Sequence, residues 1–231
     1  GGIRGITIEA DNVTLDLGGH SFNGGGGGEG IVLFGNRSNV TIRNGRIADW
    51  NAAGIWDGST ADTGVVVEDV TVTDVGLGGV EFNFTQATVR DVVVRTARAG
   101  ISVAENSRVA NSRVIDAESS GITLGEGSVV TGCVVSGAAS NGLSAGNNAG
   151  IVNTTVRNSG GAGLMTGEGA VVRGCVSTGA GASEAEQADD GGSVNPRTGE
   201  PVGAAAHEWS VVTDRDGNER IGMPDAATQE C

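Results

Sequence analysis

The residues best suited to chemistry in this sequence are Trp56, Asp57, Glu81 and Asn83. An exposed tryptophan stacks on the apolar face of a sugar ring, while a carboxylate and an amide bond its hydroxyl groups. We therefore predict that Trp56, Glu81 and Asn83 bind a carbohydrate. Asp57 and Glu81 are the candidate catalytic residues, because two carboxylates can divide acid and base roles between them. Alternatively, Asp57 and Gly58 form a plain turn whose loop partly covers Trp56.

Calcium is the one metal that the sequence leaves open. Glu105, Glu126 and Glu168 occupy one position of successive repeats, where stacked carboxylates either fan outward into solvent or hold a cation. The segment Asp214-x-Asp216-x-Asn218, with Asp225 further on, is similar to a calcium loop, but Glu219 stands where the sharp-turn glycine belongs. We expect no obligatory cofactor and no dedicated metal site.

These residues lie within a strict internal repeat. The pairs Gly100–Ile101, Gly121–Ile122, Gly142–Leu143 and Gly163–Leu164 recur every 21 residues. Equivalent pairs stand earlier at Gly5–Ile6, Gly30–Ile31, Gly54–Ile55 and Gly79–Val80, with spacings of 25, 24, 25 and 21 residues onward from the first. A fixed period of this length is typical of repeat architectures. The sequence therefore predicts eight units, of which the first three carry insertions in loops on one side.

Each unit contains three short segments in which aliphatic residues alternate with other residues. This alternation predicts three strands per unit, and strands stacked about 4.8 Å apart place like residues on like. In the first strand, Ile101 and Val103 point inward. The outward positions, and hence the candidate binding surface, hold Val32, Phe34, Trp56, Glu81, Asn83, Ser102 and Thr123.

The turn before the third strand repeats residues that tolerate a left-handed backbone. They are Asn44, Asp69, Asp91, Asn111, Gly132, Asn153 and Gly174. The next position forms an inward column that contains His20, Cys133 and Cys175. We expect His20 to fill the first unit and the two cysteines to be buried free thiols, since two rungs of about 9.6 Å exceed the roughly 7 Å that a disulfide spans.

The stretches 11–20 (DNVTLDLGGH) and 38–45 (SNVTIRNG) resemble the right-handed parallel β-helix group, which includes pectate-lyase-like and NosD-like proteins. The resemblance covers about residues 5–180 and implies an all-β, single-stranded right-handed parallel β-helix, or solenoid, of about eight coils. The resemblance also raises a role in copper-enzyme maturation, for which the sequence lacks the ligands.

The repeats define the expected domain organisation. Residues 1–182 form the β-helix, 183–206 a flexible linker rich in acidic residues and glycine, and 207–231 a tail with a β-hairpin. We expect the hairpin or the linker to cover the open strand edges of the last coil.

The composition of the chain limits the classes of partner that it can bind. The chain has 14 Lys plus Arg, 28 Asp plus Glu and a net charge of −14. Such a surface repels phosphate backbones, which argues against nucleic acid, and no apolar run is long enough to insert into a membrane. The expected partner is a polysaccharide or other glycan, and an anionic one would need bridging cations. The sequence predicts no oligomeric state.

Two functions remain open at this stage. The first is that of a secreted or cell-surface protein that binds a polysaccharide. Whether it also cleaves the polysaccharide, as a lyase or a glycoside hydrolase, stays open at this stage. The chain contains no Lys and no Tyr, which excludes family members that use either as acid or base. An arginine base with a cation, or a carboxylate pair, would remain. The second function is a non-catalytic structural or adhesive rod, favoured by small outward residues such as Ser102, Thr123 and Ser144.

Overall fold

The computed structural model describes residues 3–58, 62–180, 210–213 and 219–222. Every regular element within these ranges is a strand. Within these ranges, no helix is long and apolar enough to cross a membrane. The predicted linker at 183–206, as well as His207, Cys231 and the calcium-loop residues Asp214, Asp216, Asn218 and Asp225, lies outside the described residues.

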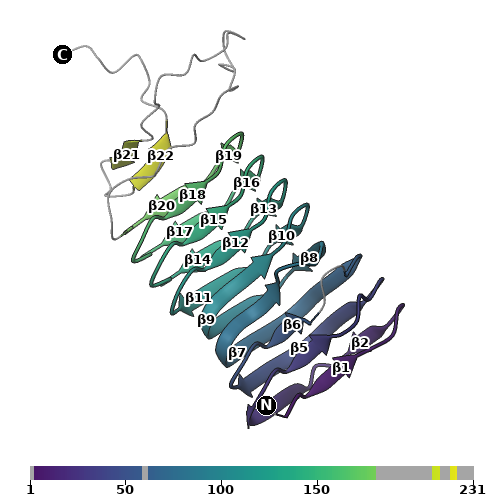
Figure 1. Cartoon of the computed structure of the whole chain (residues 1–231). Coiled ribbons are helices and arrows are strands. Elements are labelled where there is room, and N and C mark those ends of the chain that lie inside the picture. The colour runs from purple at the N-terminus through teal and green to yellow at the C-terminus, as the bar shows by residue number, and fades with distance from the viewer. Residues whose placement is uncertain (1–2, 59–61, 181–209, 214–218, 223–231) are drawn as a thin grey trace, which may run out of the picture.

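The strands wind into a parallel solenoid of about eight coils, which confirms the predicted fold (Figure 1). We number the coils 1 to 8 by their opening glycines, from Gly5 to Gly163. Each coil contributes one strand segment to each of three faces, and long strands run around a corner from one face to the next. Ile101 pairs with Ile122 and Ile122 with Leu143, so the observed register equals the repeat read from the sequence.

The faces are built as follows. The first face holds β1 (Ile6–Ile8), β4 (Ile31–Leu33), β6 (Ile55–Asp57), the ends of β7 (Val65–Phe82) and β9 (Val93–Val103), β12 (Ile122–Leu124), β15 (Leu143–Ala145) and β18 (Leu164–Thr166). The second face holds β2 (Thr14–Asp16), the starts of β5 (Thr41–Trp50) and β7, then β8 (Ala87–Arg90), β10 (Arg108–Ala110), β13 (Val129–Thr131), β16 (Gly150–Val152) and β19 (Val171–Arg173). The third face holds β3 (Ser21–Gly27), the later parts of β5 and β7, the start of β9, β11 (Arg113–Ala117), β14 (Val134–Ser136), β17 (Thr155–Arg157) and β20 (Val176–Thr178).

The tail contains the predicted hairpin. β21 (Ser210–Thr213) and β22 (Glu219–Gly222) pair in antiparallel fashion, and β22 lies against β20 of the last coil (Figure 1). The hairpin therefore lies next to a strand edge of the last coil, as expected. The boundaries of the three predicted domains stay a prediction.

The core is one continuous apolar column inside the coils. Inward residues stack on the equivalent residues of the neighbouring coils. Among them, Ile31, Ile101 and Ile122 are almost completely buried. Coil 1 differs, because no described residue stacks on its outer side. Its inward residues Leu15 and Phe22 are only partly buried.

The turn before the third strand adopts the expected conformation. All seven predicted positions have positive φ, from 48° at Asn111 and Asn153 to 64° at Gly132. In coils 5 to 8, asparagine and glycine alternate at this position. A Cβ added at Gly132 would lie 2.8 Å from Oδ1 of Asn111, so the side chain of one coil occupies the room that the next coil leaves free.

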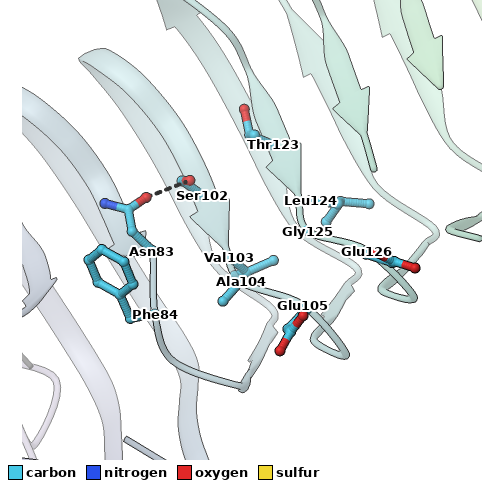
Figure 2. Close-up of a pocket in the computed structure, with 10 residues that line it drawn as sticks. All are labelled: Asn83, Phe84, Ser102, Val103, Ala104, Glu105, Thr123, Leu124, Gly125 and Glu126. Carbon is cyan, nitrogen blue, oxygen red and sulfur yellow. Dashed lines mark hydrogen bonds between the residues drawn. The ribbon is translucent and has the colours of Figure 1, made fainter. Parts of the chain in front are cut away.

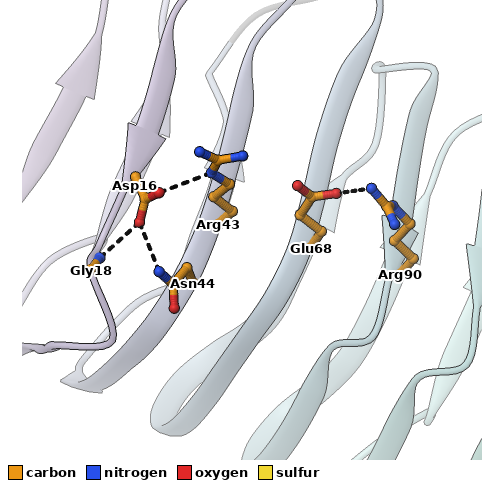
Figure 3. A network of polar contacts seen from close by, with 6 residues as sticks. All are labelled: Asp16, Gly18, Arg43, Asn44, Glu68 and Arg90. Atoms are coloured by element: carbon orange, nitrogen blue, oxygen red, sulfur yellow. Dashed lines mark hydrogen bonds and ion pairs between the residues drawn. The ribbon is translucent and has the colours of Figure 1, made fainter.

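Charges of alternating sign follow one another on the second face (Figure 3). Asp16, Arg43, Glu68 and Arg90 are register partners in successive coils. Arg43 Nε lies 3.0 Å from Asp16 Oδ2, and Arg90 pairs with Glu68. Hydrogen bonds from the Gly18 N–H and the Asn44 amide lower the pKa of Asp16, with a smaller contribution from Arg43. A slip of one residue in this exposed sheet would bring each charge out of line with its partner.

The opening glycines permit the coils to stack at full contact. A Cβ at Gly121 would lie 2.5 Å from the carbonyl oxygen of Gly142 in the next coil and would also overlap Val135. Since the obstacle on one side is backbone, the chain cannot relieve the overlap by turning a side chain.

We predict that Gly121→Ala lowers the free energy of unfolding by about 1–3 kcal/mol through overpacking. Gly150→Ala is the matched control, because a Cβ there would meet only Val129 at 3.5 Å, an ordinary contact. Urea unfolding followed by circular dichroism measures both variants. Equal stability of the two variants would contradict this account of coil stacking.

Candidate functional site

A groove of about 510 Å³ lies over coils 4 to 6 on the first face (Figure 2). Its lining comes from residues 83–84, 102–105 and 123–126, where the three first-face strands end and the following turns begin. The equivalent residues of neighbouring coils stack on one another, so the groove runs along the axis of the solenoid. This direction suits an extended polymer better than a compact molecule.

The groove offers both hydrogen-bonding groups and an aromatic ring. The Ser102 hydroxyl donates to Oδ1 of Asn83 at 3.2 Å, and Thr123 is exposed one coil further on. Ser102 and Thr123 point outward because each lies between two inward aliphatic residues, near the end of β9 and in the middle of β12. The Phe84 ring, 61% exposed, stands at the coil 4 end of the groove (Figure 2).

Glu105 and Glu126 border the groove on its turn side (Figure 2). Each precedes a residue with positive φ, Asn106 or Gly127, which places the carboxylate at the apex of the turn. Both side chains are exposed, so these carboxylates fan outward into solvent, the first of the two expected arrangements. Among the described residues, no three or more His, Cys, Asp or Glu side chains lie close enough to hold a metal ion.

Trp56 lies in the predicted outward column. Its register partners are Val32 in coil 2 and Glu81 in coil 4, and Glu81 pairs with Ser102 in coil 5. The indole ring is half-buried and leans over Gly58: a Cβ there would lie 3.2 Å from Trp56 and 3.3 Å from Phe34. We call Phe34, Trp56 and Phe84 the aromatic rim.

In coil 2, one of the two predicted outward residues is exposed and the other is buried. Phe34 is 47% exposed, and the Arg4 guanidinium lies 5.9 Å from the centre of its ring. Val32, expected on the outer surface, is completely buried. The candidate binding surface therefore begins at the turn after Leu33 rather than within that strand.

Glu81 is half-buried and turns away from the groove. Its side chain folds back over Gly78, whose N–H bonds the carboxylate, whereas the groove begins at the other end of the strand. Burial raises the pKa of Glu81, and the charge of Asp57 adds to the rise. The predicted binding and catalytic roles of Glu81 stay predictions.

Asp57 occupies an inward position and is 2% exposed. Its carboxylate accepts hydrogen bonds from the N–H groups of Asn83 (3.2 Å) and Phe84 (3.0 Å) and from the Thr85 hydroxyl (2.8 Å). Burial raises the pKa of Asp57. The carboxylate thus lies behind the backbone that forms the groove wall. Its predicted catalytic role stays a prediction, while the observed contacts hold Asn83 and Phe84 in place.

The structure adds site residues that sequence reasoning missed, chiefly Phe84, Thr85 and Asp62. Phe84 falls just beyond the strand, where the alternation of inward and outward residues ends. Asp62 and Thr85 meet only because the turns of coils 3 and 4 pack together. The aromatic character of Phe84, next to the predicted Asn83, was the one available signal.

The remaining predicted residues were expected to have structural roles. His20 is exposed, so the prediction that it fills coil 1 is wrong. Gly18 and Gly19, both with positive φ, extend the turn before it, and the Leu17 side chain packs over Gly45 instead, in the space that a Cβ there would need. Cys133 and Cys175 are free thiols as predicted; Cys133 is buried but Cys175 only partly.

Comparison with known proteins agrees with this architecture. Residues 29–177 match the family model described as right handed beta helix region. No curated protein and no solved structure matches the chain.

The thiols should differ in reactivity. Burial raises the pKa of Cys133 to about 11, so almost no thiolate forms at pH 8. We predict that iodoacetamide leaves Cys133 unmodified in the native protein and alkylates it in urea, whereas the less buried Cys175 reacts measurably without denaturant. Peptide mapping by mass spectrometry measures each site. Native alkylation of Cys133 at the rate of Cys175 would contradict its burial.

Proposed function

The chain belongs to the right-handed beta helix family, and from that premise we propose that it binds a neutral polysaccharide along the groove and the aromatic rim, without cleaving it. The observation that carries the proposal is the combination of exposed rings with a row of hydroxyl and amide groups on one face. The proposal places the protein among secreted or cell-surface proteins, where such polymers are found.

Stacking accounts for affinity. The side chains of Phe84 and Phe34 are exposed, and that of Trp56 is half-buried. The C–H groups on one side of a pyranose ring pack against the faces of aromatic rings and bury apolar area. Because the three rings belong to coils 2, 3 and 4, they offer contacts to several sugar units of one chain.

Hydrogen bonding accounts for orientation. Asn83, Ser102 and Thr123 follow the rim along the axis, with coils about 4.8 Å apart. Amide and hydroxyl groups both donate and accept, as sugar hydroxyls do. An extended polysaccharide that lies parallel to the axis would therefore meet a polar partner at each coil.

The charges favour a neutral ligand. Glu105 and Glu126 border the groove, and the whole chain carries a net charge of −14. A polymer of uronic acids would be repelled at this edge unless cations bridged it.

The positions of the carboxylates favour binding over cleavage. Glycoside hydrolysis needs two carboxyl groups in different environments beside the same bond. Asp57 lies behind the groove wall, while Glu105 and Glu126 share one exposed environment. Incubation with a retained polysaccharide should therefore release no new reducing ends.

A second candidate is the non-catalytic rod. Coils 5 to 8 keep a constant register without insertions, and their outward first-face residues include the small Ser102, Thr123 and Ser144. This regularity favours a spacer for that half of the molecule. The rod alone predicts no retention on any polysaccharide.

We predict that Phe84→Ala and Trp56→Ala each weaken binding of a retained neutral polysaccharide by about 0.5–1.5 kcal/mol, roughly two- to twelvefold. Affinity electrophoresis measures the loss. Val171→Ala, which removes an exposed apolar side chain from the second face, is the control and should bind normally. Unchanged affinity in both aromatic variants, with unchanged thermal melts, would remove the rim from the site.

We predict that the double variant Glu105→Gln/Glu126→Gln binds neutral polysaccharide within about twofold of the original protein, since the carboxylates only border the site. Binding of a uronic acid polymer should strengthen at low salt, because the repulsion is lost. Both affinities are measured with calcium and with chelator. Loss of neutral binding would instead make these carboxylates ligands of the sugar.

A further inference from the structure

We infer that Asp57 and Asp62 form a buried acid pair that shares one proton through Thr85 and holds the groove wall in place. Only the effect on ligand binding rests on the proposed function. The pair itself follows from contacts that involve no ligand.

The three side chains form a closed cluster beneath the first-face turns. Asp57 is 2% exposed, Asp62 1% and Thr85 0%. The Thr85 hydroxyl lies 2.8 Å from Oδ2 of Asp57 and 3.4 Å from Oδ2 of Asp62. Two carboxyl groups thus meet at one hydroxyl out of contact with solvent.

The number of protons available for hydrogen bonds indicates that one of the two carboxyl groups is protonated. The hydroxyl has one proton, and it donates that proton to Asp57 at the shorter distance. Only lone pairs of Thr85 then face the second carboxyl group. If both acids were ionised, this oxygen contact would be repulsive and two buried charges would lie side by side. A single proton on the pair turns the second contact into a hydrogen bond, and it belongs to the pair rather than to one residue.

The pair connects the turns that carry the aromatic rim. Asp62 accepts a hydrogen bond from the backbone N–H of Arg37, in the turn that follows Phe34 in coil 2. Asp57, in coil 3, accepts from the N–H groups of Asn83 and Phe84 in coil 4. The cluster therefore joins three successive turns, and loosening it would loosen Phe34 and Phe84 together.

This arrangement makes the wall sensitive to pH. Burial raises the pKa of Asp57, the hydrogen bonds from Phe84, Thr85 and Asn83 oppose the rise, and the charge of Asp62 adds to it. Other charged residues beside these groups are Glu81, whose pKa the charge of Asp57 raises, Arg98, which faces Glu81, and Arg37, whose backbone N–H bonds Asp62. Because the folded pKa is raised, the stabilisation is complete at low pH and is lost as pH rises through that folded value.

The test is a carboxyl carbon NMR titration of the full chain, with no ligand present. The Asp57 signal is assigned through its backbone connections to Trp56 and Gly58, so no variant of Asp57 is required. We expect its midpoint to lie above that of the same residue in the urea-unfolded chain, and Asp62→Asn to lower it because the second charge is gone. Asp116→Asn, the control, should leave it unchanged.

Two outcomes would overturn the acid pair: an Asp57 midpoint equal to that in the urea-unfolded chain, or an unchanged midpoint in Asp62→Asn. Should Asp62→Asn fail to fold, Asp62→Ser, which also removes the charge and keeps an acceptor for the Arg37 N–H, gives the same decision, and the Asp57 midpoint should again fall. Thr85→Val should move the midpoint further up, because the hydrogen bond from the Thr85 hydroxyl opposes the rise. If no polysaccharide binds at any pH, the proposed function is wrong. The titration still shows whether the acid pair exists, because it contains no ligand. If one binds, its affinity should fall with rising pH in the original protein and stay level in Asp62→Asn.

Discussion

The constraint on which this structure depends is that identical positions of successive coils stack about 4.8 Å apart. Every side chain must accommodate the equivalent residue of the coils on either side. Aliphatic residues meet this demand inside, opening glycines such as Gly121 meet it where backbone approaches backbone, and alternating charges such as Asp16 and Arg43 meet it on the surface. Glycine and asparagine share the left-handed turn for the same reason.

The turns between strands are not bound by this stacking constraint and can differ from coil to coil. Much of the candidate site is formed by these turns. The turns after Leu33 and Asp57 are longer than the corresponding turns of coils 5 and 6, and they carry Phe34 and Asp62. Just beyond them, regular coils offer Ser102 and Thr123 at a constant spacing. The site thus combines two aromatic rings from turns and one from β6 with regular strands, which supply polar groups in a row.

The same distinction explains what the sequence could predict. The register, the inward columns and the left-handed turns could be predicted from the repeat, because the same type of residue recurs at each of these positions from coil to coil. His20 escaped prediction because two added glycines in coil 1 moved it out of its column. The surroundings of Asp57 escaped for a different reason: its partners Thr85 and Asp62 come from turns without a repeat, and only the packing of those turns brings them together. The outward column through Trp56 was predictable, whereas the direction of the Glu81 side chain was not.

The central claim is that this face of the solenoid binds a polysaccharide, and the most direct measurement is backbone amide NMR during addition of neutral oligosaccharides. The account predicts shifts concentrated at residues 83–84, 102–105 and 123–126, in the same places with calcium and with chelator. Shifts confined to the second or third face, or none at the highest concentration of any oligosaccharide, would contradict it.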